Sequence, residues 1–207
     1  MKNAFPLCNA GILRGFGAFS IIRLALSLVV TKIISRRARL IRLPIYIRNR
    51  KAILLGDEFT AGVGLRIEAF GGGPDQPVIV IGKNVQINDY VHIGAVRSVR
   101  IGDDVLIASK VFISDHNHGR YSGEGQHTSP NTPPSQRELS AEPVDIGNNV
   151  WLGEFVSILP GAKIGDGSVI GSMSVVTGEI PSECMAVGAP ARVVKRYCRE
   201  RRRWERV

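Results

Sequence analysis

Two histidines beside an aspartate are the residues of this chain best suited to acid–base chemistry. They lie in the stretch Ser114-Asp115-His116-Asn117-His118-Gly119. An imidazole titrates near neutral pH, so His116 or His118 could act as a general base that removes a proton from a hydroxyl group. The other two histidines, His92 and His127, are isolated in the sequence.

A metal site is the competing interpretation of the same residues. His-x-His next to an aspartate could ligate zinc, but no cysteine cluster or further histidine spacing supports such a site. The three cysteines, Cys8, Cys184 and Cys198, are scattered without paired spacing. We therefore expect no metal, and reduced thiols in a cytoplasmic protein.

A six-residue repeat flanks these histidines and must position them. Aliphatic residues recur at 81, 87, 93, 101, 107 and 113, and again at 146, 152, 158, 164, 170 and 176. A period of six is neither helical nor a simple alternating strand, and it is typical of a parallel β-helix. The twelve positions predict four complete coils with inward aliphatic side chains, preceded by irregular coils in residues 40–76. Glycine often follows the aliphatic residue. We expect glycine there because it can adopt, at low cost, the backbone conformation that a tight corner requires.

The repeat stops between Asp115 and Pro143, and both histidines lie where it breaks. This segment is polar and rich in Gly, Pro, Ser and His. A long insertion inside a regular solenoid is usually functional. We expect a protruding loop over 115–143 that carries the chemistry; a tolerated surface loop is the alternative.

The two ends of the chain are basic, whereas the repeat body is acidic. Residues 1–51 carry eleven Lys/Arg and no acid, and residues 192–207 carry eight basic and two acidic residues. The segment between them has eight basic and sixteen acidic residues. No nucleic-acid partner is expected for such a body, and the basic ends are left to contact a membrane surface or an anionic ligand.

These patterns divide the chain into three segments. Residues 1–50 form a basic, apolar N-terminal segment that we expect to be helical, and residues 51–190 form the β-helix. Residues 191–207 are predicted to be a short basic C-terminal helix. The apolar stretch 11–34 is interrupted by two arginines and is too short to span a membrane. It either packs on the coil or a neighbouring subunit, or lies on an anionic membrane face.

Four motifs of the repeat region resemble the left-handed β-helix acyltransferases. They are Ile146-Gly-Asn-Asn-Val-Trp-Leu-Gly, Ile158-Leu-Pro-Gly-Ala-Lys-Ile-Gly-Asp-Gly-Ser-Val-Ile-Gly, Ser174-Val-Val-Thr and Val187-Gly-Ala-Pro-Ala-Arg-Val-Val. Over residues 78–196 the chain is similar to galactoside and maltose O-acetyltransferases and to sugar O-acetyltransferases of bacterial lipopolysaccharide and capsule pathways. The resemblance implies an all-β, left-handed parallel β-helix, a homotrimer with active sites between subunits, and acetyl-CoA as donor.

The resemblance also implies roles for particular residues. An ungapped count along the chain places the family's catalytic histidine at His118, with His116 two positions away helping to shape the site. Asn88 matches the acceptor-binding asparagine, and Trp151 matches the tryptophan of the catalytic cleft. Asp115, beside the two histidines, is predicted to bind substrate together with Asn88 and Trp151. Alternatively, Asn88 caps a corner and Trp151 packs between subunits.

On the donor side, Ser172 and Thr177 match positions that bind the pantetheine arm of CoA. Arg192 and Lys195 match basic positions near the CoA phosphates, where charge-assisted hydrogen bonds suit an anionic ligand; a solvated basic surface is the alternative. The chain departs from the family pattern at three places: Ser172-Met173 stands for Ala-Gly, Gly178 replaces a lysine, and Glu154 replaces a small polar residue. The missing lysine removes one cation expected near the phosphates.

These observations predict an O-acetyltransferase that acts on a sugar hydroxyl, in synthesis of O-antigen or capsular polysaccharide. The acceptor could be lipid-linked, and the protein could be peripheral at the inner membrane face. Three alternatives stay open: an antibiotic acetyltransferase of the streptogramin type, an amino-acid or amino-sugar acetyltransferase of the same fold, and a non-catalytic scaffold.

Overall fold

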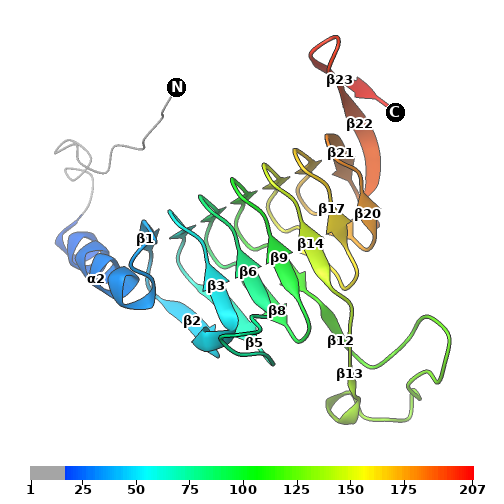
Figure 1. Ribbon diagram of the computed structural model, residues 1–207, viewed down its shortest axis with the longest axis horizontal. Coiled ribbons are helices and arrows are strands. Elements are labelled where there is room, and N and C mark those ends of the chain that lie inside the picture. Colours follow the sequence, from blue (N-terminus) through cyan, green and yellow to red (C-terminus); the bar gives the residue numbers. More distant parts are fainter. Residues whose placement is uncertain (1–16) are drawn as a thin grey trace.

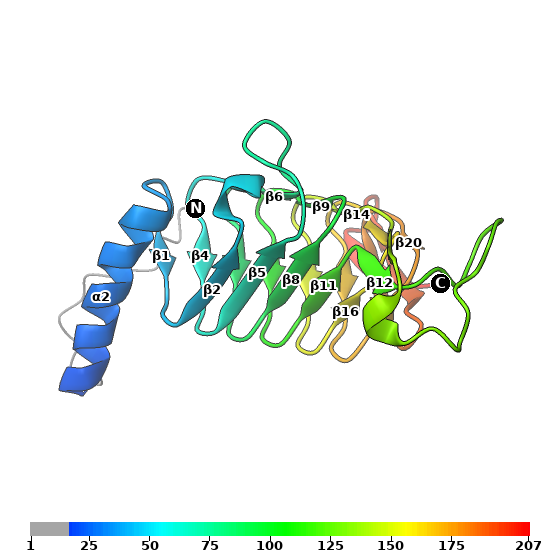
Figure 2. The same ribbon diagram turned by 90° about the horizontal axis from the view of Figure 1, so that it is seen from below.

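The computed structural model describes residues 17–207; Cys8 and the start of the apolar stretch lie outside the described residues. Short strands wind into a triangular prism whose three faces are parallel sheets, with a helix at one end (Figures 1 and 2). The predicted parallel β-helix is confirmed, and its coils are triangular.

We call the three faces A, B and C, in the order in which the chain visits them. Face A contains β1 (Leu40–Ile41), β4 (Thr60–Ala61), β7 (Gln86–Ile87), β10 (Leu106–Ile107), β15 (Trp151–Leu152), β18 (Val169–Ile170) and β21 (Cys184–Val187). Face B contains β2 (Ile45–Arg48), β5 (Leu65–Ala69), β8 (His92–Ala95), β11 (Phe112–Ser114), β16 (Ser157–Ile158) and β19 (Val175–Val176). Face C contains β3 (Ile53–Leu55), β6 (Ile79–Ile81), β9 (Val99–Ile101), β14 (Val144–Ile146), β17 (Lys163–Ile164) and β20 (Glu179–Ile180).

The core is a stack of aliphatic side chains inside the prism. All twelve positions of the six-residue repeat are buried, with side chains no more than 3% exposed. Each lies in register with its equivalent in the next coil, as Ile107 does between Ile87 and Leu152. Burial of these apolar surfaces is the main stabilising contribution to the coil, because these side chains fill the interior that the three sheets enclose.

The glycines of the repeat allow neighbouring coils to pack closely. They do not adopt the left-handed backbone conformation that we expected from the sequence. Gly147 and Gly153 have no positive φ, and a Cβ on Gly153 would lie 2.6 Å from the backbone nitrogen of Ser172 in the next coil. Two residues later, non-glycine residues turn the corner, with φ of 56° at Asn149 and 57° at Phe155. The expected role of glycine in the corner is therefore wrong at these positions.

The coil begins earlier than the regular repeat suggests. Faces B and C each have six strands, so there are six complete coils where the repeat predicted four, and the additional ones come from the irregular region 40–76. In the N-terminal segment 1–50, the described helix is α2 (Ala18–Ile34), and the first strands already follow at Leu40. A 3-10 turn, η1 (Arg50–Ala52), joins faces B and C in the first coil.

The predicted C-terminal helix is wrong. Strands β22 (Arg192–Cys198) and β23 (Arg203–Arg206) form an antiparallel hairpin that continues face A beyond β21. The rings of Tyr197 and Trp204 contact each other across this hairpin, with centroids 5.5 Å apart. The last coil exposes an unpaired strand edge, and pairing with it outweighs the helical propensity of an Arg-rich segment.

Candidate active site

The chain leaves the coil at the corner between faces B and C and returns through a two-stranded ribbon. β12 (His116–His118) pairs antiparallel with β13 (Leu139–Ala141), and His118 lies opposite Leu139. Beyond this ribbon the loop projects away from the prism, with the 3-10 turn η2 (Pro134–Gln136) near its return (Figures 1 and 2). The predicted loop thus starts at the expected residue.

Asp115 anchors the base of the ribbon. Its side chain is fully buried, and its carboxylate accepts hydrogen bonds from the backbone N–H groups of Val96, Arg97 and Ser98, at 2.7 to 2.8 Å. The same carboxylate lies 2.9 Å from Nδ1 of His116. A carboxylate held this firmly can orient the imidazole and leave its Nε2 for another partner.

His116 is packed in place, whereas His118 is presented to solvent. The His116 side chain is 14% exposed, and its ring meets the edge of Phe70 with centroids 5.3 Å apart. His118 is exposed, and its own carbonyl accepts a hydrogen bond from the Tyr121 hydroxyl. Arg137 donates a 2.6 Å hydrogen bond to that hydroxyl. The backbone of His118 is therefore held inside the loop while its imidazole is free to meet a ligand.

The other predicted residues do not join this group within one chain. Trp151 projects from face A and is 50% exposed, on a different face of the prism from the ribbon. Exposed Asn88 and Ser172 occupy corners between faces A and B, and exposed Thr177 follows face B two coils beyond the ribbon. The remaining two, Arg192 and Lys195, lie on strand β22 of the C-terminal hairpin.

A charged group on the outer surface of face B was not predicted from the sequence. Glu68 is only 3% exposed, and its Oε2 lies 2.6 Å from Nε of Arg66 and 3.1 Å from Nε2 of His92. Burial works against ionisation of Glu68, but the hydrogen bonds from Arg66 and His92 outweigh it and hold the pKa of the carboxyl below its usual value. Burial lowers the pKa of His92, and the charge of Arg66 adds to this.

Gly94 connects this group to the ribbon. A Cβ built on Gly94 would lie 3.4 Å from Cε1 of His116, 3.7 Å from the Phe70 ring and 3.9 Å from Nε2 of His92. Gly94 is buried, and its missing side chain leaves a gap of about one methyl group between these three rings, which we call the notch. Arg66 and His92 occupy the same outward position in successive coils, a register that the irregular spacing of residues 40–76 conceals in the sequence.

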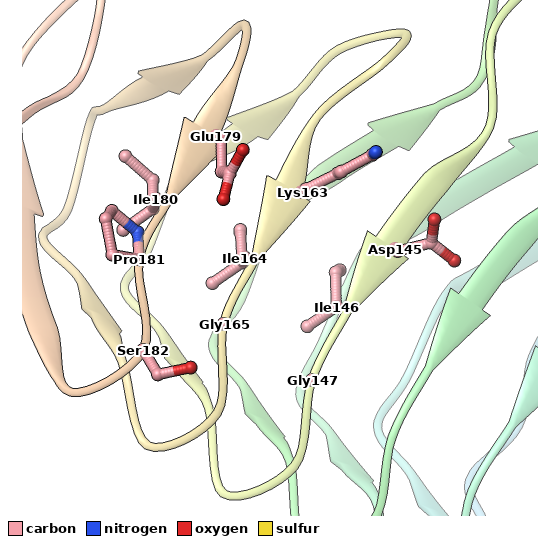
Figure 3. A pocket seen from close by; sticks show the side chains of 10 residues that line it. All are labelled: Asp145, Ile146, Gly147, Lys163, Ile164, Gly165, Glu179, Ile180, Pro181 and Ser182. Carbon is pink, nitrogen blue, oxygen red and sulfur yellow. The ribbon is translucent and has the colours of Figure 1, made fainter.

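Besides a hollow next to α2, between Phe19, Arg23 and Pro44, two further hollows of the described residues lie away from the ribbon's base. Figure 3 shows one on face C, where Asp145, Lys163 and Glu179 project from neighbouring strands and Gly147 and Gly165 line the corner. The other lies within the loop, between Arg120, His127 and Glu138. Neither is lined by a predicted site residue. Across residues 17–207, no three His, Cys, Asp or Glu side chains gather in the manner of a metal site.

Comparison with known protein families and sequences identifies relatives over nearly the full chain. Residues 143–178 match the model of the bacterial transferase hexapeptide family (six repeats). The chain is 49% identical over 191 residues to "Putative lipopolysaccharide biosynthesis O-acetyl transferase WbbJ" of Escherichia coli (strain K12), covering 92% of this chain and 95% of that protein. It is 40% identical over 117 residues to the galactoside O-acetyltransferase of the same strain, covering 56% and 53% of the two chains.

Solved structures share the fold. A maltose O-acetyltransferase from Clostridium difficile 630 superposes with a TM-score of 0.55 at 25% identity, covering 87% of this chain and 89% of that one. AntD, an N-acyltransferase from Bacillus cereus solved with dTDP and coenzyme A, gives a TM-score of 0.60 at 21% identity, covering 78% and 82%. The left-handed β-helix that the resemblance implied is thus confirmed as the fold.

Proposed function

Because this chain belongs to the hexapeptide-repeat family of bacterial acetyltransferases, we propose that it transfers an acetyl group from acetyl-CoA to a sugar hydroxyl in the synthesis of lipopolysaccharide O-antigen or capsular polysaccharide. The observation that carries this proposal is the 49% identity to WbbJ along almost the whole of both chains. The pair of histidines anchored by a buried aspartate at the break in the coil supports it, since general-base chemistry is what the transfer requires.

In the proposed reaction, His118 is the general base. Its imidazole takes the proton from the acceptor hydroxyl as the hydroxyl oxygen attacks the thioester carbonyl carbon of acetyl-CoA. The resulting tetrahedral oxyanion collapses, the carbon–sulfur bond breaks, and the CoA thiolate takes the proton held by the imidazolium. Backbone N–H groups suit the stabilisation of the oxyanion. Asp115 and His116 act as positioning residues that fix the ribbon bearing His118.

The contact between Asp115 and His116 also supports a second assignment. A carboxylate on Nδ1 is the usual partner of a catalytic histidine, and it would leave Nε2 of His116 to accept the proton. His116 is less accessible than His118, which is why we assign it to positioning. Separate alanine variants of the two histidines distinguish these assignments, as described in the Discussion.

The C-terminal hairpin offers free cations for the phosphates of CoA. In the part of the chain that the structure describes, Arg199 pairs with Glu183, whereas Arg201 and Arg203 pair with Glu205. Arg192 and Lys195 form no ion pair with a described residue, which leaves their charges available to an anionic ligand. These residues therefore fit the donor role that the resemblance implied for them.

We propose a homotrimer with each site between two subunits, because the predicted residues occupy different faces of one prism. Trp151 lies on face A and His118 beyond the corner of faces B and C. Co-expression of H118A and W151A chains tests this arrangement. If the two residues come from neighbouring subunits, each mixed trimer regains one of its three sites, which is about a quarter of all sites when both chains are expressed equally, although each variant alone is inactive. Absence of recovery in a mixed trimer would contradict the shared site.

Helix α2 supports contact with an anionic membrane, since its polar side faces the protein and its apolar side faces out. Buried Ser27 and Thr31 accept hydrogen bonds from the backbone N–H groups of Leu43 and Ile41. The outward stripe, each side chain at least 55% exposed, consists of Phe19, Ile22, Leu26, Val29 and Ile33. Basic residues follow at 36, 37 and 39, and the first acid of the chain is Asp57. An apolar stripe beside positive charge suits a helix lying in an interface.

Among residues 17–207, no helix has both the length and the hydropathy needed to cross a bilayer. The exposed apolar stripe of α2 and the basic residues after it are the basis on which we propose peripheral contact at the inner membrane face and a lipid-linked acceptor in the cytoplasm. Sedimentation with vesicles tests the contact: the chain should pellet with vesicles containing phosphatidylglycerol, and I22S/V29S should stay in solution. L54S, which changes a similarly exposed residue on face C, is the matched control. A wild-type chain that never pellets contradicts the membrane contact.

The activity itself is tested with purified protein and with cells. Release of CoA thiol from acetyl-CoA should require a sugar acceptor, and mass spectrometry of surface polysaccharide from a deletion strain should show the loss of one O-acetyl group. Acetylation of serine, an amino sugar or a streptogramin in place of sugar hydroxyls would overturn the assignment. Absence of acetyl-CoA binding by calorimetry would favour a non-catalytic scaffold.

A further inference from the structure

The outer surface of face B combines a fixed guanidinium, exposed rings and a notch directly beside the ribbon. Arg66 is held by Glu68, which also holds His92 (distances above). The aromatic residues on this surface, each at least 37% exposed, are Tyr46, Phe70 and Phe112. Exposed rings next to a fixed guanidinium suit a small ligand that carries both apolar surface and negative charge.

This surface presents positive charge to solvent. The cations of its strands are Arg48 and Arg66, and the carboxylate of the same described strands, Glu68, is buried and already bound by two partners. Arg66 uses its Nε for Glu68, so its terminal nitrogens remain for a ligand, and its side chain is 54% exposed. A guanidinium fixed in this way can bind a phosphate or carboxylate with two parallel hydrogen bonds.

The surface continues without interruption to the ribbon. The guanidinium carbon of Arg48 lies 4.8 Å from the centroid of the Phe70 ring, and the Phe70 ring contacts His116. His92, Phe70 and His116 border the notch above Gly94. A sugar placed over this notch would lie beside the histidine ribbon, with the two arginines on its far side.

We propose that this part of face B is the acceptor subsite, and that it selects a sugar carrying an acidic group, either a phosphate or a carboxylate, which Arg66 and Arg48 bind. The proposal rests on the acetyl transfer proposed above, whose acceptor it describes. Glu68 and His92 are positioning residues in this subsite, because they act through Arg66 and the shape of the notch.

Calorimetric titration of the full chain with galactose 1-phosphate, galacturonate and methyl galactoside tests the selection without requiring turnover. The two acidic ligands should bind at least about ten-fold more tightly than the neutral glycoside. R66Q should remove this preference, whereas R100Q, an exposed arginine in the middle of a face C strand, should keep it. If R66Q does not fold, R66K is measured instead: it keeps a cation for Glu68 but lacks the two-pronged group, so the preference should fall. A stronger response to the phosphate or to the carboxylate identifies the source of the acidic group.

G94A tests the notch, because the added methyl group fits at ordinary contact distances and the backbone there is not strained. It should lower kcat/KM for acidic sugar acceptors about five- to ten-fold while KM for acetyl-CoA and the Tm stay unchanged. Equal binding of acidic and neutral ligands by the wild type, or an R66Q protein that keeps the preference, overturns the subsite. If acidic ligands bind through Arg66 but no sugar accepts an acetyl group, the proposed function fails and the subsite stands.

Discussion

Faces B and C are built from the same backbone but carry different outer surfaces. Both are six-stranded parallel sheets with aliphatic residues turned inward. On face C, the outward residues of the first two strands are Leu54 and Val80. Those of the last four strands alternate in charge, in the order Arg100, Asp145, Lys163 and Glu179. On face B, the outward side of the first four strands holds a buried ion-pair group, exposed rings and the notch at Gly94.

The difference shows where function resides in a repeat of this kind. The inward position must be aliphatic to fill the coil, so it is shared by all faces and carries no specificity. The outward position is free to vary, and one face can be made into a binding surface without changing the scaffold. The break in the coil then adds a ribbon beside that face, at the corner where face B ends.

The largest expected effect is a loss of kcat that occurs on substitution in the ribbon but not in the rest of the loop. H118A should lower kcat about 10²- to 10⁴-fold, as loss of a general base does. H127A, which removes another exposed histidine of the same loop, should retain activity. Thiol release at saturating acetyl-CoA measures both. H116A should cause the smaller loss of the two ribbon variants, and a larger loss than in H118A would move the role of base to His116.

The shared interior predicts equal losses of stability on the two faces. I93A on face B and I101A on face C each empty a buried position in the same stack, at 0% and 2% exposure. Each should lower the free energy of unfolding by about 2–5 kcal/mol. Urea denaturation of the full chain measures both. A difference between them of more than about 2 kcal/mol would show that the cores beneath the faces are not equivalent.

Carboxylates on the two faces should behave differently. E68Q leaves Arg66 and His92 without their buried anion, and it should lower the free energy of unfolding by about 1–3 kcal/mol. E179Q alters an exposed residue of face C and should change it by no more than about 0.5 kcal/mol. The same denaturation experiment compares them. If E68Q and E179Q changed the free energy of unfolding equally, the Arg66–Glu68–His92 group would contribute no more to stability than an exposed ion pair.

The smallest expected effect is a pH dependence that arises on face B. Burial lowers the pKa of His92 in the folded chain below 6.5, so the unfolded chain binds more protons in mildly acidic solution. Stability should therefore fall as the pH drops below about 6.5. The lowered pKa of Glu68 adds a further loss only below 4.5. The decrease in Tm between about pH 7 and pH 5.5 should be smaller in H92Q than in the wild type. An unchanged decrease would assign it to other groups.

Much of the scaffold was predictable because its period is local. The twelve aliphatic positions, the interruption at Asp115 and the exit of the loop all follow from a pattern that each coil repeats. The C-terminal segment was mispredicted because its partner is the open edge of β21, which no local pattern reveals. The first coils were undercounted because their strands are joined by irregular turns.

The candidate site was predictable only in part. Adjacent residues such as Asp115 and His116 could be grouped by eye, whereas the hydrogen bonds that pin Asp115 come from residues 96–98, one coil earlier. Arg66 and His92 lie 26 positions apart in the sequence and meet only because a coil brings them into register.

By itself, the sequence determined the coil, since a period of six leaves no other way to bury one aliphatic side chain per unit. It also determined which residues have the chemistry to act. The tertiary structure decided which of them meet, because contacts between coils depend on how many residues each turn contains. It also decided which side of α2 faces out, and that face B, beside the histidine ribbon, holds a buried carboxylate between an arginine and a histidine.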